Sequence, residues 1–285
     1  MRESQMKKII AAAVASAFIV PAFAAEISIT GDQEFSWQDN NGVTTAELDG
    51  DFNIKASAEA ANGISVGADI NVSEIAANDG SASLTISGPF GKIDAGDTSS
   101  ALDAVDDVTD WGYELTTGTG NEDASVLWTL PTMMEGLTIN LSFSADSTSA
   151  DSDITAGNGY SVKYSFGDGD VRYGINDNED NTEQTYVAAT YSMAGVGFAI
   201  EQFTTTTAGG VDTDNDAIGV TYTTGDLTLA VETLETSSAG TTSADITTLG
   251  VHYSMGGGLT AFVEQKDDSK DTTAETMAVG LAFSF

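Results

Sequence analysis

The chain has 285 residues with 44 acidic and 9 basic side chains, so its formal net charge is −35 at pH 7. This charge excludes nucleic-acid partners, which need basic surfaces, and argues against docking on anionic lipid headgroups. The lack of cysteine excludes disulfides and thiolate metal sites, and hydrophobic residues, 41% of the chain, lie in short regular segments that argue against disorder.

The N-terminus has the pattern of a secretory signal peptide. A basic head with Lys7 and Lys8 precedes an apolar stretch that ends in Ala22-Phe23-Ala24, which fits the small-x-small cleavage rule. We therefore expect residues 1–24 to be a signal peptide for export to the periplasm and residues 25–285 to be the mature domain. The apolar stretch is too short for a membrane helix, and nothing after it stops transfer.

The rest of the chain alternates between apolar and polar residues. Residues 64–72 and 137–143 show the pattern clearly, with every second side chain apolar. A period of two predicts strands with one apolar and one polar face, and no convincing helical stripe interrupts it, so we expect an all-β fold. The sixteen predicted strands lie near 26–37, 45–59, 63–74, 81–88, 91–96, 123–130, 136–146, 159–167, 170–177, 184–193, 196–204, 216–224, 227–235, 245–254, 258–266 and 274–285.

The predicted connections alternate between short and long. Short turns include Gly167-Asp168-Gly169 and Gly256-Gly257-Gly258. Short turns on one side and long loops on the other are typical of a transmembrane β-barrel whose short turns face the periplasm. The long connections are polar and acidic, and we place them at 97–122, 147–158, 205–215 and 236–244.

Aromatic residues recur where even-numbered strands end. Tyr191, Tyr222 and Tyr253 are each 31 residues apart, the length of one hairpin repeat. Aromatic side chains at a fixed depth are typical of the girdle at a lipid–water interface. A soluble β-sandwich is the alternative, but it would not place its longest loops all on one side. The last strand ends in Phe285, and pairing it with the first strand would close the barrel and remove the exposed edges.

A barrel of roughly 16 strands is wide enough to hold an aqueous lumen. Alternation assigns the faces, because Lys or Arg on the lipid side costs about 2–4 kcal/mol at the midplane. Glu232 should therefore point inward, as should the residues that we expect to line the pore wall: Lys55, Asp69, Lys92, Asp94, Lys163 and Arg172.

Three segments of the chain resemble the general porin family of Gram-negative bacteria. The segment Ser87-Gly88-Pro89-Phe90-Gly91-Lys92-Ile93-Asp94-Ala95-Gly96 is similar to the family's hairpin that leads into its third loop. The segment Val126-Leu127-Trp128-Thr129-Leu130-Pro131, followed by Gly136-Leu137-Thr138, is similar to its Tyr-Thr-Ser-Pro hairpin with a later Gly-Leu. The terminal Phe285 completes the resemblance, which covers the whole mature chain.

The resemblance implies an outer-membrane homotrimer that lets small hydrophilic solutes and cations diffuse through a water-filled channel in the lipid bilayer. It also implies recognition of Phe285 by the barrel-assembly machinery. By order and length, 97–122 corresponds to the family's third loop, which folds into the barrel and narrows the pore. The loop has seven acids and no base, and its carboxylates expected at the constriction are Asp103, Asp106, Asp107, Asp110 and Glu114.

Some features of the loop and wall refine this expectation. The apolar residues Leu102, Val105, Val108 and Trp111 are spaced to fix the loop to the inner wall. Rings of Asp and Glu favour cations, so we expect a cation-preferring pore. The chain departs from the family where Asp97 follows Gly96, in place of the usual Arg, and its basic wall is thin. These departures argue against the family's strong transverse field and against anion preference.

Other functions find little support in the residues. His252 is the only histidine and no Gly-x-Ser-x-Gly motif is present, so we expect no catalytic residue, and acid pairs such as Asp106-Asp107 are expected by chance. The acidic segments at 177–180 and 212–216 lack EF-hand features, so diffuse counterions are expected in place of a metal or cofactor site. Two alternatives remain. The aromatic residues Trp111 and Tyr113 of the loop favour a substrate-specific channel, and the other alternative is a structural or adhesive barrel with a closed lumen.

Overall fold

The computed structural model describes residues 26–60, 63–73, 80–113, 115, 123–144, 157–178 and 182–285. The expected signal peptide therefore lies outside the described residues, and so does Glu114 of the expected constriction. The described residues contain no helix long and apolar enough to cross a membrane.

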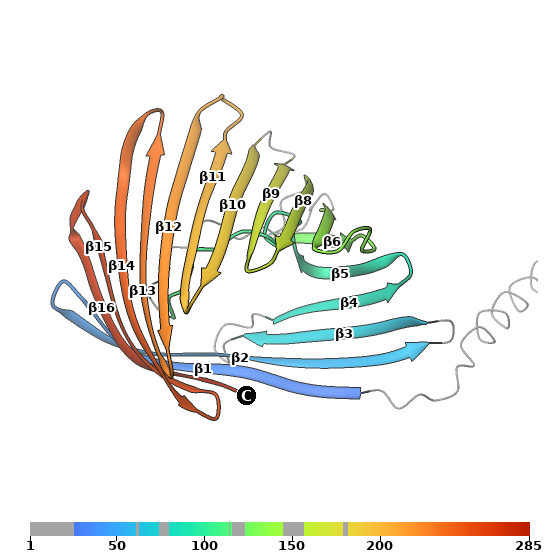
Figure 1. The fold of residues 1–285 in the computed structure, drawn as a ribbon, viewed down its shortest axis with the longest axis horizontal. Helices are drawn as coiled ribbons and strands as arrows, with labels where there is room; N and C mark the ends of the chain where they lie inside the picture. Colours follow the sequence, from blue (N-terminus) through green and yellow to red (C-terminus); the bar gives the residue numbers. More distant parts are fainter. Residues whose placement is uncertain are drawn as a thin grey trace, which may run out of the picture.

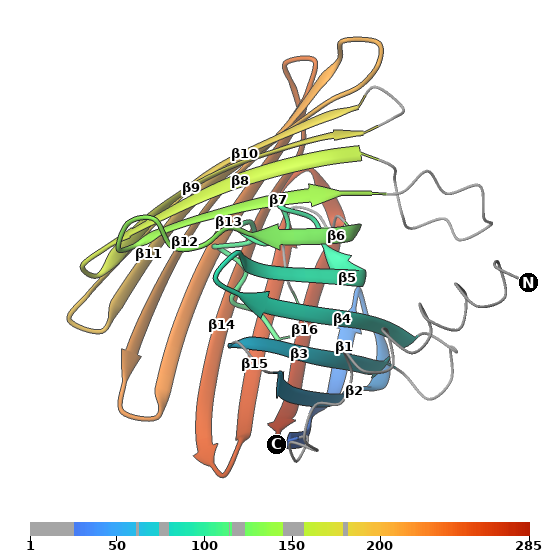
Figure 2. The same ribbon diagram turned by 90° about the vertical axis from the view of Figure 1, so that its right-hand side faces the viewer.

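Sixteen antiparallel strands form one closed barrel, in which each strand pairs with its neighbours in the chain and β1 pairs with β16 (Figures 1 and 2). The all-β prediction and all sixteen predicted strands are thus confirmed. The strands are β1 (Glu26–Asn40), β2 (Val43–Ala60), β3 (Ile64–Ser73), β4 (Gly80–Gly88), β5 (Gly91–Ser99), β6 (Asp123–Thr129), β7 (Leu137–Phe143), β8 (Gly157–Phe166), β9 (Gly169–Asn178), β10 (Glu183–Met193), β11 (Val196–Thr206), β12 (Asp212–Thr224), β13 (Leu227–Ser238), β14 (Thr241–Gly256), β15 (Leu259–Asp268) and β16 (Asp271–Ser284).

Two of the predicted long loops are wrong. The connection expected at 205–215 shrinks to 207–211, and the one expected at 236–244 is a two-residue turn at Ala239-Gly240. Ala239 has φ 50° and Gly240 has φ 76°, the left-handed pair that a tight hairpin requires. The strands extend into polar Thr, Ser and Asp sequence because both of their faces stand in water there, so the alternation that marks a half-apolar strand disappears.

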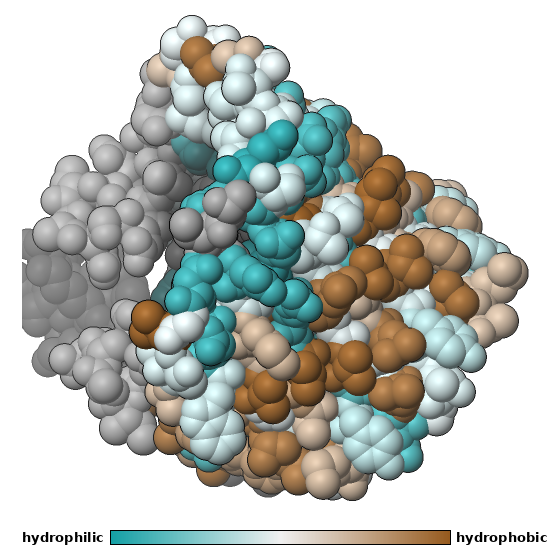
Figure 3. Space-filling model, turned by 90° about the vertical axis from the view of Figure 1, so that its left-hand side faces the viewer, coloured by the Kyte–Doolittle hydropathy of each residue, from teal (hydrophilic) through white to brown (hydrophobic). Residues whose placement is uncertain are grey.

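The outer surface carries the apolar half of each strand. Ile200, Ile218 and Val231 are all more than 40% exposed, which in water would leave large apolar side chains uncovered. Figure 3 shows such side chains gathered over a broad area of one side of the barrel, beside a hydrophilic region. Tyr191 and Tyr253 are also exposed, as the aromatic girdle requires.

The two ends of the strand order close on each other. Phe285 N–H donates to the Gly31 carbonyl at 2.9 Å, and Gly31 N–H donates back to the Phe285 carbonyl at 3.0 Å. A Cβ on Gly31 would lie 3.0 Å from the Phe285 ring, so glycine leaves room for the terminal aromatic side chain. Closure removes the unpaired strand edges that an open sheet would expose.

The segment between β5 and β6 does not stay outside the barrel. Its described part, residues 100–113 and 115, contacts inward-facing residues of β9–β16, and Figure 1 shows it crossing the interior. We call these residues the inner loop. Its position divides the interior into a covered wall, formed by β9–β16, and an open wall, formed by β2–β5.

Candidate functional site

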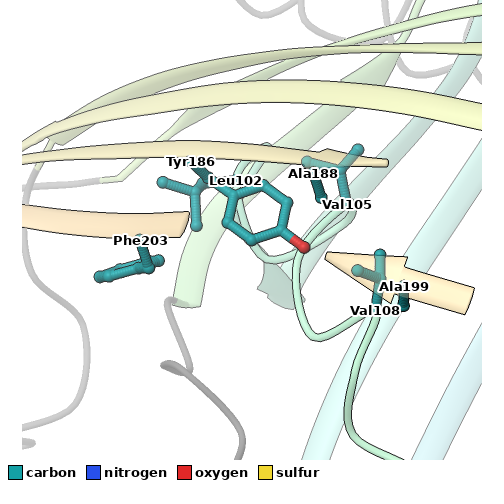
Figure 4. Close-up of a cluster of buried hydrophobic side chains, with 7 residues drawn as sticks. All are labelled: Leu102, Val105, Val108, Tyr186, Ala188, Ala199 and Phe203. Carbon is teal, nitrogen blue, oxygen red and sulfur yellow. The ribbon is translucent and has the colours of Figure 1, made fainter. Parts of the chain in front are cut away.

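Apolar side chains attach the inner loop to the covered wall. Leu102, Val105 and Val108 are at most 7% exposed and form one cluster with wall residues, against which Trp111 also packs. Figure 4 shows the loop side chains facing those of the strands. The apolar loop residues that were predicted to attach the loop to the inner wall therefore pack against that wall. The wall members of the cluster are Tyr186 and Ala188 of β10 and Ala199 and Phe203 of β11.

Small residues on the covered wall make room for the loop. A Cβ on Gly174 of β9 would lie 3.4 Å from Leu102, and one on Gly219 of β12 would lie 2.9 Å from the Trp111 ring. In β16 a Cβ on Gly280 would lie 2.3 Å from Phe262, which packs beside Leu115 of the loop. The inner face therefore fits the loop closely because these positions lack larger side chains.

Glu201 of β11 holds the middle of the loop by hydrogen bonds. Its carboxylate accepts from the Val108 backbone N–H at 2.8 Å, the Thr109 hydroxyl at 2.6 Å and the Tyr186 hydroxyl at 2.7 Å. Glu201 is 2% exposed, so these donors replace the water that its charge would otherwise need. The arrangement satisfies backbone donors that a buried loop cannot pair within itself.

Two further glutamates on alternate strands repeat this role. Glu264 of β15 accepts the backbone N–H groups of Tyr113 at 2.7 Å and Leu115 at 2.9 Å, and it also contacts His252 Nε2 at 2.9 Å. Glu232 of β13 receives a hydrogen bond from the Trp111 backbone. The loop thus lies along a row of buried carboxylates from β11, β13 and β15, spaced by about one hairpin.

The predicted basic residues of β8 and β9 lie at the other end of the docked segment. Arg172 Nη1 donates to the Val105 carbonyl at 3.0 Å, and Arg172 Nε contacts Asp170 at 2.6 Å. Lys163 Nζ lies 3.8 Å from the same Asp170 carboxylate. These two cations therefore share one acid, and Arg172 also supports the loop backbone.

The four described acids predicted for the constriction differ in their surroundings. Asp106 is 8% exposed, and its Oδ2 has no hydrogen-bond partner among the described residues. It therefore does not present its carboxyl group to open water, which corrects the expectation for this residue. Asp103, Asp107 and Asp110 are half-buried. The physical reason is docking of the loop, because Asp106 lies near enough to Glu201 and Tyr186 of the covered wall to interact with both. The next residue, Asp107, takes a left-handed φ of 51°.

Burial changes the acid–base chemistry of two loop carboxyl groups. Burial, then the neighbouring charges of Asp107, Asp103 and Glu201, raise the pKa of Asp106 to about 9. Burial and the nearby Asp107 raise the pKa of Asp110 to about 6, although a backbone hydrogen bond from Gly112 opposes the shift. At neutral pH Asp106 is therefore neutral, so the predicted ring of charges at the loop is weaker than the count of acids implies.

The open wall borders a polar space of about 860 Å³ beside the loop. Four predicted wall residues line it, and they form two ion pairs: Lys55 with Asp69 at 3.0 Å and Lys92 with Asp94 at 2.9 Å. Both lysine side chains are about half exposed (55% and 51%), so each faces water as well as its partner. Ala104 of the loop lines the opposite side.

The structure thus separates the predicted site residues into two groups. Lys55, Asp69, Lys92 and Asp94 line the open space, whereas Arg172 lies at the covered wall beneath the loop. Sequence reasoning missed Glu201 and Glu264 as supports of the loop. The available signal was their spacing with Glu232, since 201, 232 and 264 recur at one hairpin length among otherwise small or apolar inward positions.

Among the described residues, no three His, Asp or Glu side chains are placed to hold a metal ion. His252 is engaged with Glu264 and lies edge-on to Tyr113, with ring centroids 4.9 Å apart. The geometry is that of a passage lined by polar residues beside a loop that packs on one wall.

Comparisons with known proteins agree with this geometry. Residues 11–273 match the family model described as Gram-negative porin, and no curated protein matches the chain. Salmonella typhi OmpF in complex with daunomycin has a TM-score of 0.76 at 13% identity, over 91% of this chain and 97% of that one. The trimer form of Vibrio cholerae OmpT has a TM-score of 0.72 at 15% identity, over 92% and 100%.

A third solved structure, a triple mutant of the Rhodopseudomonas blastica porin, has a TM-score of 0.71 at 18% identity, over 91% of this chain and 100% of that one. At such identities these likenesses show the fold, while the family model covers most of the sequence. Family and fold are those of channels that carry out no chemistry. The chain belongs to the Gram-negative porins, the channel-forming barrels of the outer membrane.

Proposed function

We propose that this porin lets small hydrophilic solutes and ions diffuse passively along the open wall and that it prefers cations. The observation that supports this most is the one-sided position of the inner loop, which packs on β9–β16 and leaves the polar space of about 860 Å³ beside β2–β5. Size filtering then depends on the gap between the loop and the open wall. Charge filtering depends on the side chains along that gap.

The charge balance along the passage supports the cation preference. Each of the four predicted wall cations lies within 4 Å of a carboxylate, so none offers an isolated positive charge. On β1 and β2, Asp32 pairs directly with Asp51, and Glu34 pairs with Asp49. These acids share the face of Ser28, which lines the passage, because side chains alternate along a strand. Carboxylates that outnumber the cations along a passage attract cations and repel anions.

The test is the reversal potential of single channels in a planar bilayer with a KCl gradient. Ohmic current steps and a reversal potential on the cation side are expected. A reversal potential on the anion side would contradict the charge argument, and a folded, membrane-embedded barrel without current would favour a closed structural barrel. The preference should weaken as salt rises, because screening shortens the reach of the wall charges.

Assembly and export complete the proposal. We propose a homotrimer, supported by family membership and by the trimer form reported for the similar OmpT. Light scattering of the detergent-solubilised protein should give three times the protomer mass. We also propose cleavage of residues 1–24 on export and recognition of Phe285 by the assembly machinery. N-terminal sequencing of outer-membrane protein tests the first proposal, and deletion of Phe285 should reduce membrane insertion without reducing export.

A further inference from the structure

A second recess lies between the inner loop and the ends of β13–β15. Its volume is about 350 Å³, and its lining comes from loop residues 110–113 and from short polar residues of the wall. The wall part includes Asp226, which lies in the turn before β13, so the recess opens on the short-turn side of the loop. It is separate from the space beside the open wall, with which it shares no lining residue.

The strand register explains why polar groups converge here. Thr228 of β13 pairs with His252 of β14, and Ser254 of β14 pairs with Thr260 of β15. All four line the recess, so it has hydroxyl groups on three neighbouring strands. The Ser254 backbone N–H donates to the Asp226 carbonyl at 2.8 Å, which fixes the turn that carries the Asp226 carboxylate.

One side of the recess is an aromatic surface held in place from behind. The Tyr113 ring stacks on Phe262 with centroids 5.3 Å apart and an interplanar angle of 14°. Its backbone N–H is fixed by Glu264, which also contacts His252. Tyr113 is nevertheless 42% exposed, so the part of its ring that Phe262 and His252 leave uncovered is open to a solute. Such a surface binds without reorganising, which reduces the entropic cost of association.

Acidic side chains contribute charge to the recess. Asp110 and Asp226 line it together with His252, and none of the described lining residues is Lys or Arg. Asp226 is exposed in its turn, so its carboxylate is open to a ligand that supplies a charged N–H group. Charge-assisted hydrogen bonds of this kind are stronger than those between neutral groups.

We propose that this recess is a binding site for small amine-bearing polyols of about monosaccharide size. The two carboxylates bind the ammonium group, the hydroxyl groups of Thr228 and Ser254 bind the polyol, and the exposed part of the Tyr113 ring packs against the cation or the sugar ring. The inference rests on the proposed function, because the solute reaches the recess through the lumen. Binding in the recess would make this general diffusion pore retain amine-bearing polyols as they pass.

The experiment measures glucosamine binding in two ways, with glucose as the neutral probe of equal size. In a planar bilayer, glucosamine should interrupt single-channel current in a concentration-dependent manner, and glucose should do so at least about tenfold more weakly. Calorimetry with detergent-solubilised protein measures binding without any current. A barrel that binds glucosamine but conducts no ions would overturn the proposed function and retain the site.

Asp226→Asn is the decisive variant because Asp226 is exposed in a turn whose backbone hydrogen bond does not need the carboxylate. We expect its glucosamine association constant to fall about tenfold, the loss of one charge-assisted hydrogen bond. The matched control is Asp168→Asn, since the Asp168 carbonyl likewise accepts from Ser192 at 2.8 Å but lies outside the recess. Equal binding of glucose and glucosamine, or equal affinity of Asp226→Asn and the parent, would overturn the site.

Discussion

The covered wall and the open wall are made from the same kind of strand but carry different inward residues. On β2–β5 most inward positions are Asn, Lys, Asp, Ser or Thr, which face water. On β9–β16 they include Gly174, Ala199 and Gly219, together with buried glutamates such as Glu201. A wall that receives a loop needs small surfaces and acceptors for backbone N–H groups, whereas a wall that faces water needs neither.

Removing Glu201, the main acceptor for the loop on the covered wall, should have the largest effect on the difference between the two walls. Glu201→Ala leaves the Val108 N–H and the hydroxyls of Thr109 and Tyr186 without their acceptor. At about 1–3 kcal/mol for each of these three unsatisfied buried groups, docking of the loop should weaken by about 3–9 kcal/mol. Heat unfolding in detergent should shift to lower temperature, and single-channel conductance should rise or fluctuate as the loop detaches.

Glu235→Ala is the control, because Glu235 is an exposed glutamate of β13. Its conductance and unfolding temperature should match those of the parent. If Glu201→Ala also leaves both unchanged, the carboxylate does not hold the loop.

Proton binding by Asp106 should make the stability of the docked loop depend on pH. The pKa of Asp106 rises from its usual 3.8 to about 9 in the folded protein, so the docked loop favours the protonated acid. Its contribution to docking is full below about pH 4 and is lost as pH rises through about 9. The heat-unfolding temperature of the parent should therefore fall between pH 7 and 10.

Asp106→Asn removes this titration while keeping the shape of the side chain. Its unfolding temperature should vary less over the same range than that of the parent. Identical pH dependence in the two proteins would show that Asp106 does not titrate in the docked loop.

A single methyl group should test the fit of the loop. Gly219→Ala places a Cβ 2.9 Å from the Trp111 ring, so Trp111 must move or the wall must yield. We expect a loss of about 1 kcal/mol in stability and a red shift of Trp111 fluorescence. Gly67→Ala on the open wall is the matched control, because its Cβ would meet nothing closer than 3.5 Å. Equal effects at the two positions would contradict a closely packed covered wall.

The smallest effect on stability is expected from the lysines of the open wall. Lys55→Gln with Lys92→Gln breaks two exposed ion pairs, which contribute at most about 1 kcal/mol each. The cation preference should nevertheless increase, because Asp69 and Asp94 lose their partners within the passage. Reversal potentials measure this change, and Lys270→Gln, in the exposed turn between β15 and β16, should leave them unaltered.

The barrel was predictable because lipid and water on opposite faces impose a strict period of two. That signal located all sixteen strands, including the terminal strand that pairs with β1. It failed at 205–215 and 236–244, where strands extend beyond the membrane and both faces are polar. Alternation arises only where the two faces of a strand meet different environments, so it does not mark a strand whose two faces both meet water.

The site was less predictable because it depends on contacts between distant segments. The apolar positions Leu102, Val105 and Val108 indicated an attached loop, and alternation placed Lys55 and Lys92 on the inner face. Nothing local distinguishes Glu201, which contacts a loop more than ninety residues away, from an acid in water. The burial of Asp106 likewise follows from docking of the loop beside Glu201, which sequence spacing does not reveal.

The most direct test of the central claim uses the lack of cysteine in the chain. Single cysteines at Ser83, which lines the open passage, and at Ala217, which is buried on the covered wall, are exposed to a charged thiol reagent during single-channel recording. We predict that Ser83→Cys reacts quickly and loses conductance, whereas Ala217→Cys stays unmodified with its conductance intact. Rapid reaction and block at Ala217→Cys, with none at Ser83→Cys, would place the passage on the other wall and contradict this account.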